Sequence, residues 1–150
     1  MNVQTYGALM IKPRDLRIMQ FVRRHAIDTE KMYNCKMAAA LASKNQVISL
    51  GRNCNRTHPM AARYGRHHEG VFLHAEIAAI VNALNHVDKS ELLRSTLYIH
   101  RVKHLNEYSS EWVDGLAKPC TGCMAAIVAF GIKKVVFSTN TQAEYDHFEM

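Results

Sequence analysis

The sequence has 150 residues, of which 48% are hydrophobic and 21% charged, with a formal net charge of +6. This length and composition predict one globular domain, residues 1–150, with a sizeable core. No apolar run approaches the roughly 18 residues that span a bilayer, and the N-terminus lacks a signal-peptide pattern, so we expect no membrane partner and a cytoplasmic location. The positive surplus favours anionic partners such as nucleotides or nucleic acid, although a solubilising surface charge explains it equally well.

The sequence contains four cysteines. A chain with a full core and no secretory signal does not fit a disulfide scaffold. We therefore expect a reducing compartment, in which the thiols are free to bind metal.

The first half of the chain predicts a helix followed by a hairpin. Pro13 suits a first helical turn, and apolar residues recur at roughly helical spacing up to residue 27. Residues 33–43 and 46–53 predict two strands joined at Lys44 and Asn45. Residues 54–70 are polar and rich in arginine and histidine, which predicts a loop.

The second half predicts helices over residues 74–87 and 120–130, the latter closed by Gly131. Strands are expected at residues 95–102 and 132–139, with a long loop at 105–118, whereas the last ten residues carry no clear signal. The final strand–helix–strand unit favours a parallel, right-handed crossover. We therefore predict the α/β class, with a mixed sheet covered by helices.

His74 and Glu76 lie two positions apart at the start of a predicted helix. Inside a helix such positions point to nearly opposite sides. Around the first turn, however, side chains ring the axis and can converge on a point just beyond the helix end. Both residues can therefore reach one site if the helix begins near Leu73. Taken alone, His74 and Glu76 are better explained as an ordinary helix start, in which an acidic residue complements the helix dipole.

Cys120 and Cys123 lie three positions apart at another predicted helix start, where the helix dipole favours thiolate. Such a pair fits a redox centre, half of a structural zinc site, or part of a catalytic metal site. Its place near the end of the sequence disfavours the redox centre, and no second pair completes a closed site. With His74 there are three ligands and one open tetrahedral position, where zinc lowers the pKa of water to roughly 7. Glu76 is then placed to carry the proton.

The two motifs together, HAE followed by PCxxC, resemble the signature of the zinc-dependent cytidine deaminase-like superfamily. The resemblance covers roughly residues 31–139 and is greatest to the deoxycytidylate deaminases and their phage-encoded relatives. It implies a three-layer αβα fold, with a mixed sheet and helices on both faces. It also implies Zn2+ as the cofactor and a homo-oligomeric assembly.

Carried over by position, the resemblance assigns His74, Cys120 and Cys123 as zinc ligands and Glu76 as the proton carrier. Asn55 matches an asparagine that contacts the nucleotide in relatives, although a turn residue also suits its position. Other residues are expected at the substrate because they adjoin the ligands or carry positive charge: Ala75, Pro119, Arg56 and Arg63.

The implied activity is hydrolytic deamination of the cytosine ring of a free nucleotide, dCMP to dUMP with release of ammonia. One alternative is a deaminase that acts on cytosine or adenine in single-stranded nucleic acid. Another is a non-catalytic, zinc-stabilised binding module, which would have no need of Glu76 as a proton carrier.

The sequence departs from the family pattern in two places. Residues 103–118 are inserted before the second motif and are expected to lie beside the pocket, with Tyr108 and Trp112 as candidate stacking residues. Typical members also continue beyond the last predicted strand, so we expect the far edge of the sheet to be missing or covered by a partner subunit. The small side chains of residues 38–40 would allow elements to approach closely.

The polar segment 54–70 allows three interpretations: a solvated loop, a phosphate site formed by its arginines, or a second zinc site. The candidate ligands of that second site are Cys54, His58, His67 and His68.

Overall fold

A computed structural model of the chain describes residues 4–6, 11–29, 35–64 and 72–150. Its main sheet has the strand order β1-β9-β8-β6-β2-β3, with β7 paired to β6, and a small second sheet joins β4 to β5. The strands are β1 (Gln4–Tyr6), β2 (Cys35–Ser43), β3 (Gln46–Arg52), β4 (Cys54–Thr57), β5 (Phe72–Leu73), β6 (Thr96–His104), β7 (Trp112–Gly115), β8 (Lys134–Ser138) and β9 (Tyr145–Glu149). The helices are α1 (Pro13–Ile27), α2 (Pro59–Tyr64), α3 (Ala75–Leu84), α4 (Lys89–Leu92) and α5 (Thr121–Ala129). None of these helices is long and apolar enough to cross a membrane.

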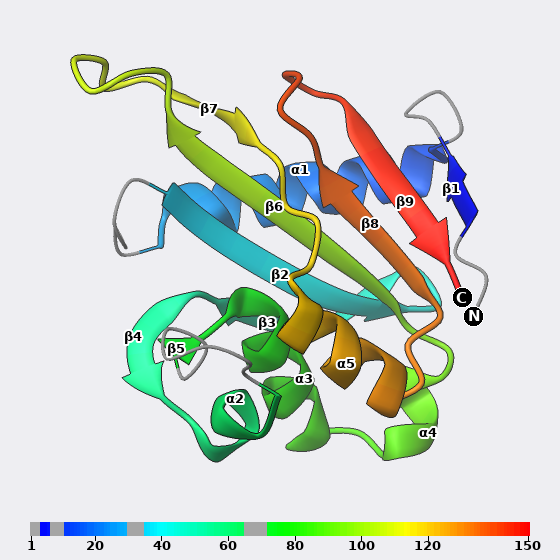
Figure 1. Cartoon of the computed structure of the whole chain (residues 1–150). Coiled ribbons are helices and arrows are strands. Elements are labelled where there is room, and N and C mark those ends of the chain that lie inside the picture. Colours follow the sequence, from blue (N-terminus) through cyan, green and yellow to red (C-terminus); the bar gives the residue numbers. More distant parts are fainter. Residues whose placement is uncertain (1–3, 7–10, 30–34, 65–71) are drawn as a thin grey trace.

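The elements form three layers, with α1 on one face of the main sheet and α3 and α5 on the other (Figure 1). The predicted mixed sheet with helices on both faces is therefore confirmed. Alternate residues of β2 serve the two cores, as strand geometry requires: Ala38 and Ala40 pack in the cluster under α1, and Ala39 packs in the cluster under α3 and α5. These alanines are fully buried within the chain. Their small side chains therefore allow the helices of the same chain to approach the sheet, and they are not available to a partner subunit.

The β2–β3 hairpin turns at the two predicted residues. Lys44 and Asn45 have φ angles of 51° and 68°, which a two-residue hairpin turn requires. The two strands pair antiparallel from Ala38–Arg52 to Ser43–Gln46. The hairpin prediction is confirmed.

The head of α3 rests directly on β3, because Gly51 has no side chain. A Cβ atom there would lie 2.3 Å from the Ala79 nitrogen and 2.4 Å from the Ala75 oxygen. The Ser49 hydroxyl donates to the Ala79 carbonyl at 2.8 Å, which fixes the helix along the strand. Gly51 thus sets the height of α3 above the sheet.

The unit β6–α5–β8 forms the predicted crossover, and β6 pairs parallel with β8 from Thr96–Lys134 to Ile99–Phe137. After α5 the chain turns at Gly131, whose φ of 75° is the left-handed conformation expected of a residue that ends a helix.

The structure corrects two predictions of irregular chain. The described part of residues 54–70 contains β4 and α2. Between them, the His58 ring accepts from the backbone N–H of Met60 at 3.0 Å. The predicted loop 105–118 contains β7, which pairs with the outer half of β6 from Arg101–Gly115 to His104–Trp112. Both strands are four residues long, too short and too polar for a clear alternating pattern.

The far edge of the sheet is also different from the expectation. Residues 145–149 form β9, which pairs antiparallel with β8, and β1 pairs with β9 in turn. The outer edge of β8 is therefore covered by β9 of the same chain.

The β7 strand is tied to the rest of the molecule through a buried aspartate. Asp114 accepts from the Arg23 Nε at 2.8 Å and from the Ala143 N–H at 2.8 Å. The His100 Nε2 lies 3.6 Å from the same carboxylate. These contacts join β7 to α1 on one side and to the β8–β9 turn on the other.

Candidate functional site

Three residues from two distant segments meet where α3 and α5 begin. The potential ligand atoms of His74, Cys120 and Cys123 all lie within 4.8 Å of one another. The Nδ1 atom of His74 is 3.6 Å from the Cys120 sulfur and 3.4 Å from the Cys123 sulfur. The structure thus brings together the three residues that the two motifs predicted.

Helix N-termini position all three side chains. His74 and Cys120 are the residues immediately before α3 and α5, and both have extended backbones. The Cys120 sulfur accepts from the Cys123 N–H at 3.5 Å, so Cys120 also caps α5. Since α3 and α5 contact each other on one face of the sheet, the positive ends of their dipoles are near the sulfurs, where they favour thiolate (Figure 1).

The two thiols differ in acidity. Hydrogen bonds with Cys123 and then with His74 lower the pKa of Cys120 to about 3. The hydrogen bond to Cys120, followed by burial, raises the pKa of Cys123. The hydrogen bond with Cys120 is also the main reason why the pKa of His74 is raised. One imidazole nitrogen and two sulfurs are a donor set that suits zinc, and a bound divalent ion would deprotonate both thiols.

Glu76 is buried beside this cluster, with 2% of its surface exposed. Its Oε2 has no hydrogen-bond partner among the described residues. Burial is the largest influence on its pKa and raises it, while the charge of His74 opposes the shift. A buried, unpartnered carboxylate oxygen is costly for folding, which makes Glu76 a candidate for a chemical role.

Ala75 and Pro119 are both buried next to the ligands. Ala75 packs in the core cluster under α3 and α5 and is fully buried. The Ala75 carbonyl lies in the space that a side chain at position 51 would occupy. The first turn of α3 therefore packs directly on the backbone of β3.

Asn55 and Arg56 lie in a bulge of β4. This strand pairs with β5, the two residues that directly precede His74, through Cys54–Leu73 and Thr57–Phe72. Asn55 and Arg56 fall between these pairs, and both are exposed. Their side chains are therefore available to a ligand that binds beside β5, the segment that leads into the cluster.

Arg63 lies farther along, in the last turn of α2. Its guanidinium is over the Tyr64 ring, 5.7 Å from the centroid, and Tyr64 is tilted against Phe130 at 6.4 Å. Arg63 is exposed, and its contacts are with this aromatic pair rather than with the ligands.

The proposed second zinc site has little support in the described residues. The metal-binding group found there is the His74 cluster alone, without Cys54 or His58. His58 already has a structural role, because its Nδ1 accepts from the start of α2. His67 and His68 lie outside the described residues.

The aromatic residues of the insertion do not form a platform at the cluster. Trp112 is paired with His104 and stacks on its ring at 4.0 Å, with the Lys36 ammonium 4.7 Å from the Trp112 centroid. Trp112 packs against the core cluster under α1, on the face opposite the cysteines. Tyr108 is 91% exposed in the β6–β7 connection, which extends away from α3 and α5 (Figure 1).

Two residues that the motifs did not indicate help to position the site. Gly51 allows α3 to lie directly against β3. The only sequence signal for this contact is a glycine inside a predicted strand. Asn53 accepts from the Met37 N–H at 2.9 Å through its side chain and directs the chain from β3 into β4. No pattern in the sequence identifies this second contact.

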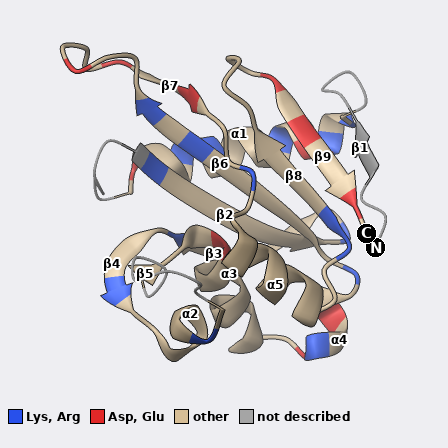
Figure 2. Cartoon of the chain, viewed as in Figure 1, with Lys and Arg blue, Asp and Glu red and all other residues tan. Residues whose placement is uncertain are grey.

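Basic residues lie on two of the elements around the site (Figure 2). Figure 2 shows basic residues on β4 and on the outer half of β6, with the acidic start of α3 between them. This distribution favours an anionic ligand on the cysteine-bearing side of the molecule.

The chain was compared with known families and structures. The model of the family described as "Cytidine and deoxycytidylate deaminase zinc-binding region" matches residues 12–139. No curated protein sequence matches the chain. Similar folds include dCMP deaminase from the cyanophage S-TIM5 in apo form, with a TM-score of 0.53 and 20% identity over 83% of this chain and 82% of that one. The same cyanophage enzyme in complex with dCMP and dUMP has a TM-score of 0.52 and 19% identity over 83% and 81% of the two chains.

The family match spans most of the chain and includes both motifs, and zinc is the metal of this family. The donor set of His74, Cys120 and Cys123 agrees with it. The chain therefore belongs to the cytidine and deoxycytidylate deaminase family.

Proposed function

We propose that this chain is a zinc-dependent enzyme that removes the amino group from the cytosine ring of a free nucleotide, converting dCMP and water to dUMP and ammonia. The observation that carries the proposal is the convergence of three ligand atoms within 4.8 Å beside the buried, unpartnered Glu76. The similar fold of a cyanophage dCMP deaminase that was solved with dCMP and dUMP supports the choice of substrate.

His74, Cys120 and Cys123 would hold the zinc, which would supply a Lewis acid that makes water nucleophilic at neutral pH. Glu76 would accept the proton that this water loses and deliver it to N3 of the cytosine ring as a C4–O bond forms. The same carboxyl group would then take the proton of the new C4 hydroxyl and give it to the departing amine, so that the C4–N bond breaks, ammonia leaves and C4 becomes a carbonyl. Its burial keeps bulk water from competing for that proton.

Asn55 and Arg56 are our candidates for holding the nucleotide. Both are exposed in the β4 bulge beside the residues that lead into His74. The amide of Asn55 can both donate and accept, and the guanidinium of Arg56 suits a phosphate group. Ala75 and Pro119 would shape the pocket, and Arg63 is the alternative phosphate contact.

A free nucleotide fits this surface better than a strand of nucleic acid. A strand needs a series of aromatic platforms along a basic groove. Of the two aromatic candidates, Trp112 packs on the α1 side and Tyr108 lies in the hairpin connection away from the cluster.

The test is ammonia release and mass change with dCMP, deoxycytidine and a cytosine-containing single strand at two salt concentrations. We expect dCMP to be preferred, and Arg56→Ala to lower kcat/KM for dCMP roughly tenfold while leaving deoxycytidine little changed. Arg52→Ala is the matched control, because Arg52 is exposed on the adjacent strand but contacts His25 of α1.

Efficient deamination of the strand with dCMP untouched would replace the nucleotide by single-stranded nucleic acid as the substrate. A zinc-loaded protein that releases no ammonia from cytosine or adenine substrates would instead indicate a binding module.

A further inference from the structure

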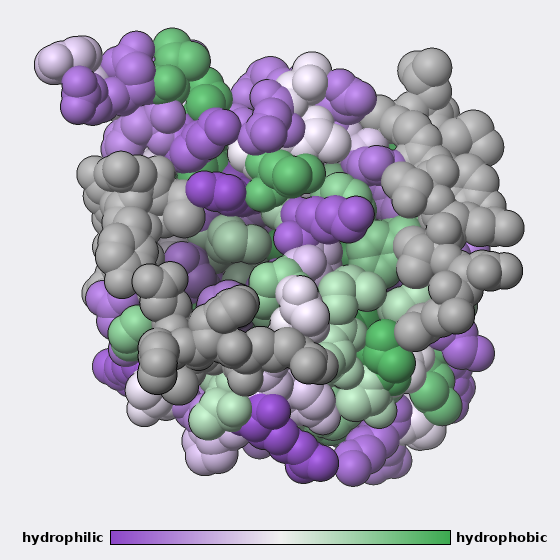
Figure 3. Space-filling view, viewed as in Figure 1, coloured by the Kyte–Doolittle hydropathy of each residue, from purple (hydrophilic) through white to green (hydrophobic). Residues whose placement is uncertain are grey.

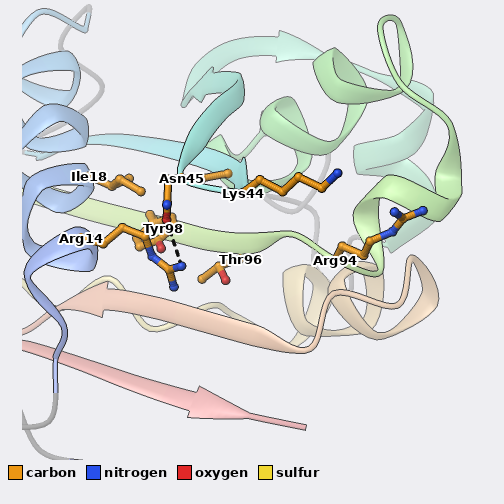
Figure 4. Close-up of a pocket in the computed structure, with 8 residues that line it drawn as sticks. Arg14, Ile18, Lys44, Asn45, Arg94, Thr96 and Tyr98 are labelled. Carbon is orange, nitrogen blue, oxygen red and sulfur yellow. Dashed lines mark hydrogen bonds between the residues drawn. The ribbon is translucent and has the colours of Figure 1, made fainter.

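A cavity of about 110 Å³ lies at the turn end of the β2–β3 hairpin (Figure 4). Its apolar lining comes from Ile18, Ala42 and Tyr98, which belong to the core cluster under α1. Cys123 belongs to the other core cluster, under α3 and α5. The cavity is therefore on the opposite face of the sheet from the candidate zinc site.

Three cationic residues from three parts of the chain line this cavity. Figure 4 shows Arg14 on α1, Lys44 in the hairpin turn and Arg94 in the segment that leads into β6. Arg14 is oriented by a hydrogen bond from its Nη1 to the side-chain Oδ1 of Asn45 at 3.1 Å. Among the described residues, neither Lys44 nor Arg94 forms an ion pair.

The lining contains no acidic residue to balance this charge. The nearby carboxylate of Asp15 accepts from the Tyr98 hydroxyl and the Lys134 ammonium, and is 3.4 Å from the Arg14 Nε. Glu91 accepts from the Ser43 hydroxyl at 2.6 Å. Asp15 thus offsets part of the Arg14 charge, and the three cationic residues still leave the lining with a surplus of positive charge.

We propose that this cavity binds a phosphate group, carried by inorganic phosphate or by a small phosphomonoester. The volume holds several water molecules, which is enough for one phosphate group. Guanidinium groups bind phosphate through paired N–H donors, and Lys44 adds a third charge. The Thr96 hydroxyl and the Asn45 amide supply neutral donors in the same lining.

A phosphate held by these residues would connect α1, the hairpin turn and the start of β6. Because it binds only where the three elements meet, it would stabilise the folded state by an amount that grows with the logarithm of its free concentration above the dissociation constant. The site does not depend on the proposed deaminase activity, since none of its lining residues belongs to the zinc cluster or to the nucleotide-binding candidates.

The experiment is thermal unfolding of the full chain in increasing inorganic phosphate, with sodium chloride of equal ionic strength as the reference. At phosphate tenfold above its dissociation constant we expect Tm to rise by about 3–6 °C. The test variant is Lys44→Asn with Arg94→Gln, because asparagine tolerates the left-handed backbone at position 44. We expect its phosphate affinity to fall roughly tenfold.

The matched control is Lys89→Gln with Arg24→Gln, which removes the same charge from exposed residues outside the cavity. The control should keep the wild-type response. An equal response in both variants, or a wild-type Tm that follows ionic strength alone, would overturn the proposal.

A parallel titration with glycerol 3-phosphate separates the two sources of the group, since this compound has no base to address the zinc site. A larger Tm rise than with inorganic phosphate would assign the site to phosphomonoesters, and a smaller one to the free ion.

Discussion

Cys120 and Cys123 reach the same point because one precedes α5 and the other lies in its first turn. Each sulfur is close to the His74 ring, and no acidic residue is needed to complete the set. The proposed zinc site therefore depends on both thiols acting as metal ligands.

We predict that Cys123→Ala lowers the zinc content from about one per chain and lowers stability as well, because metal binding to such a site is coupled to folding. Mass spectrometry for zinc and chemical unfolding measure the two effects. Cys54→Ala is the matched control, since Cys54 is a free cysteine outside the cluster. Full zinc occupancy in Cys123→Ala would remove this residue from the site.

At the scale of elements, the contact between β3 and α3 holds the site in place. Gly51→Ala should destabilise the protein by about 1–3 kcal/mol or more, because the added Cβ would meet backbone atoms of α3 at 2.3 Å and 2.4 Å. We expect a loss of zinc affinity in parallel, as the head of α3 carries His74. Urea unfolding and zinc titration measure these changes.

Gly115→Ala is the control for this prediction. Its Cβ would meet two flexible side chains, Arg101 at 3.3 Å and Lys103 at 3.5 Å, so stability should change by no more than about 0.5 kcal/mol. If both variants lose stability equally, the close approach at Gly51 is not what positions α3.

His100 of β6, which lies beside Asp114 of β7, gives the fold a predictable response to acid. Burial lowers the pKa of His100 from 6.5 to about 4, although the nearby Asp114 favours the charged form. The unfolded chain therefore binds the extra proton first, so stability from this residue is complete above pH 6.5 and is lost as the pH falls toward 4. The loss is a few kcal/mol, at about 1.4 kcal/mol per pH unit.

This response is measured as the difference in unfolding free energy between the wild type and His100→Gln across that range. Parallel curves for the wild type and His100→Gln would contradict the assignment.

The elements that could be predicted from the sequence are those with a local signal. The β2–β3 hairpin has its two turn residues, and α3 and α5 have apolar repeats that begin at the motifs. The elements that could not be predicted depend on distant partners: β7 is held by Arg23 of α1, and β9 by its pairing with β8.

The site shows the same division. The three ligands and Glu76 follow from motif spacing at helix starts. The contribution of Gly51 depends on a contact across 28 residues of chain, between β3 and Ala79, which no local pattern contains.

At the scale of the whole molecule, α5 is unusual because it contains no charged residue yet is partly exposed, as at Val128. Figure 3 shows weakly polar and apolar surface over this helix. A helix that is apolar on all sides is normally covered, and we propose that a second copy of the chain covers it. The prediction is a homo-oligomer by light scattering at micromolar concentration.

Val128→Asp should convert that oligomer to a monomer, because a charge would be buried in the contact. Val47→Asp is the matched control, because Val128 is 42% exposed and Val47 is 37% exposed. Val47 lies on β3, an edge strand of the main sheet, and not on α5. A monomeric wild type, or dissociation by both substitutions, would contradict the α5 interface.

The most direct test of the central claim is ammonia release from dCMP by Glu76→Gln, with zinc quantified in the same sample. Glutamine keeps the size of the buried side chain but cannot carry the proton. We predict about one zinc per chain in both proteins and a loss of turnover of roughly 10²- to 10⁴-fold in the variant. Turnover near the wild-type value in zinc-loaded Glu76→Gln would show that Glu76 does not carry the proton.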